Sequence, residues 1–172
     1  MRKVEVVPHN PNWRKVFDVE SRLIADALGA NVVAVHHMGS TAIPDIYAKP
    51  IIDFLVEVQD IIQVDDYGSK MESLGYQVMG EFGIPDRRFF MKDTPKGIRI
   101  CHVHIFNTCS SQIKRHLGFR DYLIAHPKLA DEYSELKRKL AIEYSTDIDS
   151  YIAGKAEFIK QIDRQVAQLN LQ

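Results

Sequence analysis

Cysteine is scarce in this sequence, and long apolar runs are missing. Two cysteines, Cys101 and Cys109, occur among 172 residues. Two thiols without a secretory signal are typical of free cysteines in a reducing compartment, and residues 1–20 contain no apolar signal core. The longest apolar runs are too short to cross a bilayer. We therefore expect a cytoplasmic protein with no membrane partner.

Net charge is also nearly absent. The 22 lysines and arginines are balanced by 23 aspartates and glutamates, which leaves a formal charge of -1. Near-neutrality argues against an extended nucleic-acid surface but is compatible with a local basic pocket. Hydrophobic residues make up 45% and charged residues 26%, as is usual for a globular domain. We predict a single domain over residues 1–172.

Glycine and proline become rare after Ser110, and the hydrophobic pattern there is helical. It predicts three helices, and the earlier part predicts a helix ending near Leu28 and another near residues 64–74. Strand patterns occur at 3–7, 32–38, 51–58, 76–82, 87–92 and 98–106. The fold class is therefore α+β: a mixed sheet of about five strands with flanking helices (about 1–108), then a helical part (about 109–172). The three helices are expected at about 110–125, 128–145 and 148–170.

A Gly-Ser-Thr turn follows the strand predicted at 32–38. Gly39 permits a tight turn and the close approach of a phosphate, and Ser40 and Thr41 offer hydroxyl and N–H groups to its oxygens. Such a turn in isolation is more often a plain capped turn. Lys49 further along is either a phosphate ligand or an ionic partner of Asp53.

Asp53 interrupts an apolar strand, where an ionised carboxylate is costly without partners. His102 and His104 lie two apart on another strand and so share one face, where they can hold a metal or a phosphate. Ordinary surface histidines are the alternative. Arg88 and Arg120 add positive charge suited to bidentate phosphate binding.

The run 39-GSTAIPDIYAKPIIDFLV-56 resembles the GrpB family, whose members have a Gly-Ser-Thr turn, a Lys-Pro pair and an aspartate in an apolar strand. The resemblance extends over nearly the whole chain. It includes the Trp13 segment, residues 75–90, 102-HVH-104, 119-FRDYL-123 and the spacings Tyr133/Lys137 and Tyr151/Lys155.

The resemblance implies a nucleotidyltransferase-type fold. In that superfamily an Asp-x-Asp pair and a third carboxylate hold two divalent metal ions, with Mg²⁺ as the expected ion. Here the first aspartate corresponds to Asp53, but Leu55 occupies the second position, and His102 and His104 lie on the strand expected to carry the third carboxylate. A further departure is Asp45, where the family often has glycine.

Three functions remain open. In the first, a nucleotidyltransferase-like enzyme binds a nucleotide or other phosphate-bearing ligand. Asp53, Lys49 and His104 are its catalytic candidates and Asp53, His102 and His104 its metal ligands. The second is a non-catalytic, regulatory ligand-binding module on a degenerate fold, suggested by Leu55. The third is a metal-dependent phosphate-ester hydrolase. The phosphate-binding candidates are Gly39, Ser40, Thr41, Lys49, Arg88 and Arg120.

Overall fold

The computed structural model describes residues 3–170, and their contacts divide into two compact units. The sheet unit comprises residues 11–38 and 51–114, and the helical unit comprises residues 3–10, 39–50 and 115–170. The division differs from a simple boundary near residue 108, because two early segments group with the C-terminal helices. The single domain over 1–172 stays a prediction, and each unit is described by itself.

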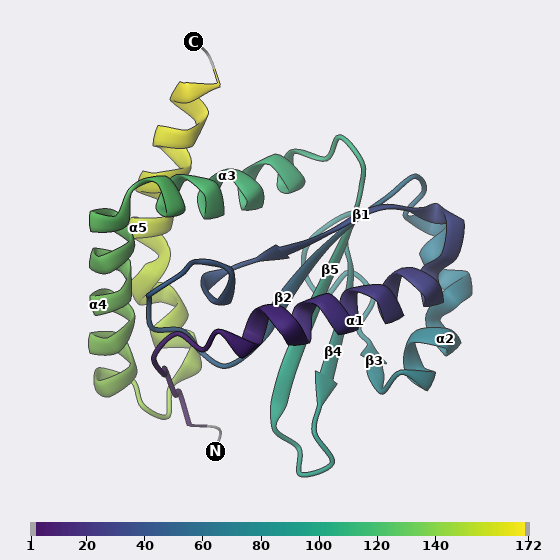
Figure 1. Cartoon of the computed structure of the whole chain (residues 1–172), viewed down its shortest axis with the longest axis horizontal. Helices are drawn as coiled ribbons and strands as arrows, with labels where there is room; N and C mark the ends of the chain where they lie inside the picture. The colour runs from purple at the N-terminus through teal and green to yellow at the C-terminus, as the bar shows by residue number, and fades with distance from the viewer. Residues whose placement is uncertain (1–2, 171–172) are drawn as a thin grey trace. The chain divides into compact units, whose positions relative to one another are not determined.

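The sheet unit contains a five-strand mixed sheet, counted over residues 3–170, in the order β1-β2-β5-β4-β3 (Figure 1). The central strands β2 and β5 run parallel, and the other neighbours are antiparallel. The predicted mixed sheet is confirmed. Its elements are α1 (Asn12–Leu28), β1 (Val32–Met38), β2 (Ile52–Val58), α2 (Gly68–Ser73), β3 (Tyr76–Val78), β4 (Arg88–Asp93) and β5 (Arg99–Asn107).

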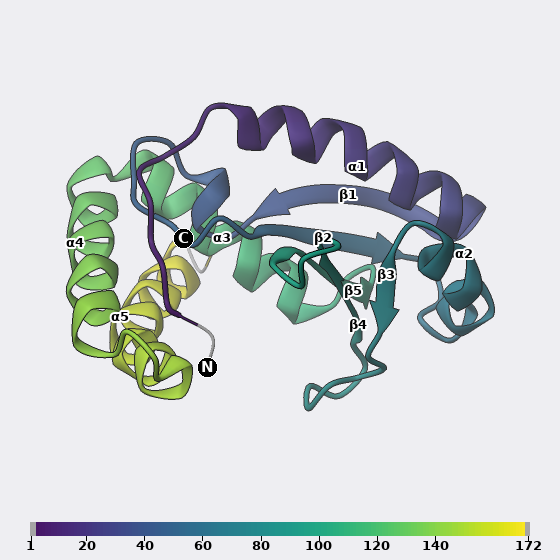
Figure 2. The same cartoon turned by 90° about the horizontal axis from the view of Figure 1, so that it is seen from below.

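Helix α1 covers one face of this sheet, and Figure 2 shows it running alongside β1. The Phe17 ring of α1 stacks on His37 of β1 at 4.7 Å and on Phe54 of β2 at 5.1 Å between ring centroids. Because side chains alternate along a strand, His36 and Asp53 lie on the opposite face. The register supports this assignment, since His36 pairs with Leu55 and Met38 pairs with Asp53.

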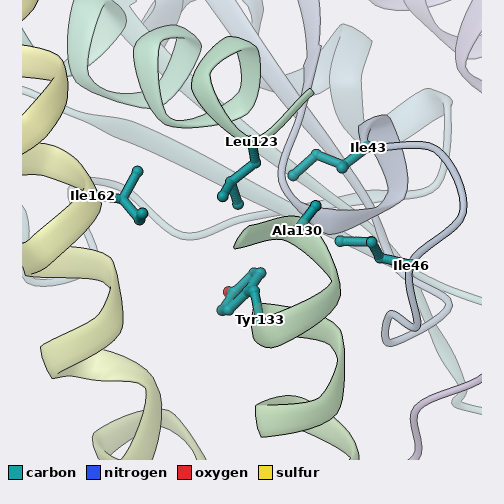
Figure 3. Close-up of a cluster of buried hydrophobic side chains, with 6 residues drawn as sticks. All are labelled: Ile43, Ile46, Leu123, Ala130, Tyr133 and Ile162. Carbon is teal, nitrogen blue, oxygen red and sulfur yellow. The ribbon is translucent and has the colours of Figure 1, made fainter. Parts of the chain in front are cut away.

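The helical unit contains α3 (Ser111–Ala125) from Arg115 onward, α4 (Pro127–Glu143) and α5 (Ile148–Leu169). All three helices were predicted, and Asp147 caps α5 by accepting a hydrogen bond from the Ser150 N–H at 3.1 Å. Within residues 3–170 no helix is long and apolar enough to span a membrane. Figure 3 shows the buried cluster that joins these helices to the 39–50 segment: Ile43, Ile46, Leu123, Ala130, Tyr133 and Ile162.

Three predicted elements differ in the structure. Residues 3–7 form no strand: Val7 makes an isolated bridge to Ala48, and the Val4 N–H donates to the carbonyl of Ser145. The helix predicted near 64–74 is a 3₁₀ helix (Ile62–Tyr67) followed by the short α2. β3 ends at Val78, before a turn with positive φ angles. Local patterns did not reveal these breaks because long-range backbone pairing decides them.

Candidate metal site

Asp53, His102 and His104 come together on the sheet face opposite α1. The parallel pairing of β2 with β5 sets Asp53 beside His102 and Leu55 beside His104. His102 Nδ1 lies 3.3 Å and His104 Nε2 3.6 Å from the same carboxylate oxygen, Asp53 Oδ1. One candidate ligand atom from each residue lies within 4.8 Å of the others. This cluster, the metal trio, is the set of side chains that the sequence pointed to.

The metal trio is partly open to solvent, because its side chains are 16–27% exposed. Phe89 of β4 packs against the two imidazoles. It is buried and pairs with His104 in the strand register. The Phe89 ring lies 4.9 Å from His104 and 5.4 Å from His102, centroid to centroid. The apolar ring restricts how the imidazoles rotate while leaving the carboxylate accessible.

An arginine guanidinium lies next to the second ring nitrogen of each imidazole. Arg87 Nη1 lies 3.3 Å from His104 Nδ1, and Arg99 Nη1 lies 3.4 Å from His102 Nε2. A guanidinium can only donate hydrogen bonds, so the nitrogen facing it must accept. In a neutral imidazole the N–H then sits on the other nitrogen, which points at Asp53. The geometry therefore indicates two chains of polar contacts, each running from an arginine through an imidazole to the Asp53 carboxylate.

The pKa values follow from these contacts. Burial would raise the pKa of Asp53, but the contacts of His102 and His104 with its carboxylate outweigh burial and hold the pKa below its usual value. Burial lowers the pKa of His104, and the nearby Arg87 lowers it further, whereas Asp53 partly opposes the shift. The site therefore favours an ionised carboxylate beside a neutral His104.

The metal trio fits a divalent ion in its separations and its donor atoms. Two imidazoles with one carboxylate suit transition metals such as Zn²⁺ or Mn²⁺ better than Mg²⁺, which prefers oxygen ligands. The surrounding groups differ from the usual pattern, because metal-binding imidazoles normally donate their second N–H to an acceptor. Here Arg87 and Arg99 occupy those positions. A metal ion would bind the ring nitrogen that faces Asp53. The N–H of each imidazole would then have to move to the other ring nitrogen, which faces Arg87 or Arg99.

Arg88 lies apart from the metal trio. Arg88 pairs with Ile105, one position along from the pair of Phe89 and His104. Because side chains alternate along a strand, the Arg88 side chain projects from the opposite face of the sheet. There its guanidinium binds both carboxylate oxygens of Asp65, at 2.7 and 3.0 Å. Its buried neighbour Arg87 reaches the site instead, held by the carbonyls of Glu81 and Phe82.

The sequence pattern led to Arg88 rather than its neighbour Arg87, and it gave no role to Arg99 or Phe89. Arg99 is an odd-numbered residue of β5, so regular alternation directs it away from His102. The ladder between β4 and β5 shifts register between Lys92 and Asp93, next to Arg99. Alternation alone could have found Phe89 but not Arg99, because a register shift leaves no local sequence signal.

The Gly-Ser-Thr turn belongs to the helical unit. Gly39 has φ 72° and ψ -171°, a conformation that strongly favours glycine, and Ser40–Ala42 form one 3₁₀ turn. The N–H of Ala42 donates to the Gly39 carbonyl at 3.1 Å. Thr41 is buried, with 2% of its surface exposed, whereas Gly39 and Ser40 are partly exposed. Gly39 and Ser40 are thus better situated to meet a ligand than Thr41.

Three further residues of the helical unit bear on the sequence analysis. The Lys49 ammonium lies 5.6 Å from the centre of the Tyr151 ring. Arg120 Nε donates to Asp121 Oδ1 at 2.7 Å. Asp45 has φ 64°, a left-handed conformation that glycine adopts more readily than aspartate. The structure therefore groups Asp53, His102 and His104 in one unit and Gly39, Ser40, Thr41, Lys49 and Arg120 in the other.

Comparison with known proteins defines the family. The family model described as "GrpB protein" matches residues 3–165. The chain belongs to the GrpB family. It is 45% identical over 159 residues to the UPF0157 protein YqkA of Bacillus subtilis, covering 92% of this chain but only 46% of YqkA. It is 34% identical over 163 residues to the glutamate-rich protein GrpB of Alkalihalophilus pseudofirmus, covering 93% and 94% of the two chains.

A further relative of this GrpB-family chain has a name that states an activity. It is the dephospho-CoA kinase of Mycolicibacterium paratuberculosis, with 24% identity over 187 residues. The match covers 94% of the present chain and 46% of the kinase. As with YqkA, the chain spans about half of that longer relative.

Solved structures agree with the family and extend the fold comparison. The crystal structure of the conserved protein GrpB from Enterococcus faecalis matches with a TM-score of 0.92 and 39% identity, covering 98% of this chain and 100% of that one. The structure of Cid1 in complex with its short product ApU matches with a TM-score of 0.51 and 9% identity, covering 76% and 40%. The fold is therefore nucleotidyltransferase-like.

Proposed function

We propose that this GrpB-family protein binds a divalent metal ion through Asp53, His102 and His104 and, with it, a nucleotide or another phosphate-bearing ligand. The observation that carries the proposal is the metal trio, two imidazoles directed at one oxygen of an ionised carboxylate. A metal bound there supplies positive charge to phosphate oxygens. The donor set favours a transition metal over Mg²⁺.

The phosphate part of the proposal has two supports. The nucleotidyltransferase-like fold is shared with Cid1, which was solved with the product ApU, and this is an analogy at the level of fold. A relative is named as a dephospho-CoA kinase, so its named activity involves a phosphorylated compound. Lys49 and His104 join Asp53 as the proposed catalytic groups. The proposed phosphate ligands are Gly39, Ser40 and Lys49, with Thr41 and Arg120 as further candidates. Arg88, whose guanidinium binds Asp65 on the other face of the sheet, is no longer among them.

A second candidate is ligand binding without turnover. Leu55 is fully buried where the two-metal enzymes have a second carboxylate, so one of the usual metal positions has no acidic ligand. The arginines behind His102 and His104 add positive charge where a second metal ion would be repelled. These features favour one metal ion and a regulatory or sensing role.

Metal binding is tested by calorimetric titration of Mn²⁺ and Zn²⁺ into the protein after treatment with a chelator. We expect one site in the unmodified protein and at least a tenfold loss of affinity, by order of magnitude, in Asp53→Asn and His104→Gln. His126→Gln is the control, because His126 is an exposed histidine outside the metal trio. Equal affinity in the unmodified protein and both trio variants would overturn the metal site.

Turnover is tested separately by incubating the protein with each nucleoside triphosphate, Mn²⁺ and a mixture of small hydroxyl-bearing metabolites. Pyrophosphate release that disappears in Asp53→Asn supports nucleotidyl transfer. Nucleotide binding in the calorimeter without pyrophosphate release supports the non-catalytic candidate. Cleavage of a phosphodiester to a phosphomonoester and an alcohol, without any triphosphate, would instead support the hydrolase alternative.

A further inference from the structure

A lysine of α4 is buried in the helical unit. Lys137 is only 1% exposed, and its ammonium donates a hydrogen bond to the carbonyl of Tyr47. The same ammonium lies 4.5 Å from the centre of the Tyr133 ring. An ammonium has three donors, so this hydrogen bond leaves it able to bind further acceptors.

Two more lysines of the helical unit lie against a second tyrosine ring. The Lys155 ammonium of α5 lies 4.7 Å from the centre of the Tyr151 ring, and the Lys49 ammonium lies 5.6 Å from the same centre. Lys155 is close enough to Lys137 for their positive charges to repel. One ammonium group therefore lies against the Tyr133 ring and two lie against the Tyr151 ring. This group of Lys49, Lys137 and Lys155 is the lysine cluster.

The charge of Lys137 is poorly compensated. Among residues 3–170 no carboxylate forms an ion pair with it. Burial, and secondarily the charge of Lys155, lower the pKa of Lys137 to about 7. A buried cation that repels a neighbouring cation costs stability, whereas an anion between them would turn the repulsion into attraction.

A purely structural role is the alternative. Lys137 binds the Tyr47 carbonyl, and the Ser134 hydroxyl accepts a hydrogen bond from the Tyr47 N–H at 2.8 Å, so α4 holds the 39–50 segment from both sides. That role explains Lys137 alone. It does not account for Lys155, whose positive charge repels that of Lys137.

We propose that Lys49, Lys137 and Lys155 form a binding site for a doubly charged oxyanion, the phosphate group of a small ligand, with Tyr133 and Tyr151 as its aromatic walls. The site lies entirely in the helical unit and needs no metal. It shares Lys49 with the phosphate ligands of the proposed function but does not depend on the metal trio, so either site can fail without the other.

The test measures binding of inorganic phosphate and pyrophosphate by calorimetry at constant ionic strength, near neutral pH and with a chelator present. We expect Lys155→Gln and Lys49→Gln to weaken binding at least fivefold, by order of magnitude, because each removes one of three converging charges. Lys160→Gln on α5 and Lys139→Gln on α4 are matched controls, because both lysines are exposed. Asp53→Asn is expected to bind both anions normally while losing metal affinity.

A second measurement follows the Lys137 side chain by nuclear magnetic resonance. Saturating phosphate is expected to raise its pKa, because an adjacent anion stabilises the ammonium form. The lysine cluster is not an anion site if the unmodified protein fails to bind either probe, or if Lys49→Gln and Lys155→Gln bind as the controls do. An unchanged pKa of Lys137 at saturation would also overturn it, whatever Mn²⁺ or Zn²⁺ do at the metal trio.

Discussion

The negative charge of Asp53 is tolerated inside an apolar strand because two imidazoles stabilise it. Two imidazole N–H groups point at it, and each imidazole in turn accepts from an arginine. The dependence runs both ways, since the Asp53 carboxylate is the group that favours protonation of His104 against burial and against Arg87. The electrostatics of this site are therefore coupled residue by residue.

This coupling predicts the effect of Asp53→Asn on His104. The substitution removes the negative charge that raises the pKa of His104, so that pKa should fall further below its ordinary value near 6.5. The measurement is a titration of the histidine ring protons by nuclear magnetic resonance in metal-free protein.

Glu57→Gln is the matched control for this titration. Glu57 is a carboxylate on the same strand and face as Asp53, but it binds His36, with 2.6 Å between His36 Nε2 and Glu57 Oε2. The control should leave the His104 titration unchanged. A His104 pKa that rises in Asp53→Asn would contradict the arrangement of charges described here.

At the residue scale, the sequence selected three residues that do lie together, Asp53, His102 and His104, but not the residues around them, and metal binding by the trio stays a prediction. Strand alternation put His102 and His104 on one face, and an unexplained carboxylate drew attention to Asp53. The choice between Arg87 and Arg88 depends on which residue begins β4 and on its register with β5. A shift of one residue in the pairing of β4 with β5 would exchange the faces of Arg87 and Arg88, and no local sequence pattern determines that pairing.

At the scale of elements, lengths were easier to predict than partners. β1 and the three C-terminal helices agree with their predicted ranges to within two residues. The parallel pairing of β2 with β5, which creates the site, joins strands that are more than forty residues apart. Such pairing follows from the packing of whole elements, so single-strand patterns carry no information about it.

The contact of α3 with α5 offers a prediction at this scale. A Cβ added to Gly118 would lie 2.5 Å from Val166 Cγ1, and a β-branched side chain in a helix has few rotamers to escape into. Gly118→Ala should therefore destabilise the protein by about 1–3 kcal/mol, despite the helix preference of alanine. Urea denaturation measures the change.

Val166→Ala in the Gly118→Ala background should recover part of the loss, because it removes the valine methyl group that the added Cβ would meet. Val166→Ala alone should destabilise, since Val166 packs on the buried cluster of the helical unit. A double variant whose losses simply add would show that the two positions do not conflict in the folded protein.

At the scale of the whole molecule, each unit carries its own polar cluster. The sheet unit surrounds one carboxylate with imidazoles and arginines, and the helical unit collects ammonium groups around two tyrosines. The sequence did not predict that residues 3–10 and 39–50 would join the C-terminal helices. Their attachments, Val4 to Ser145 and Tyr47 to Ser134, each span half of the chain or more and leave no local sequence signal.

The buried Lys137 links this arrangement to the stability of the whole protein. Its pKa is about 7 in the folded protein and 10.5 in an unfolded chain, so between these values the unfolded chain holds a proton that folded Lys137 has lost. Stability contributed by this group therefore rises with pH across that window. Lys137→Met abolishes the contribution. The free energy of unfolding of the unmodified protein should therefore rise, relative to that of Lys137→Met, by up to about 4 kcal/mol between roughly pH 7 and pH 10.

Chemical denaturation of both proteins at several pH values measures this gain, and other titrating groups cancel in the difference between them. Lys139→Met on the exposed side of α4 is the matched control and should run parallel to the unmodified protein. A constant difference between Lys137→Met and the unmodified protein would mean that Lys137 stays charged throughout. Its burial would then be compensated within the folded chain, and the reason for an anion beside it would be lost.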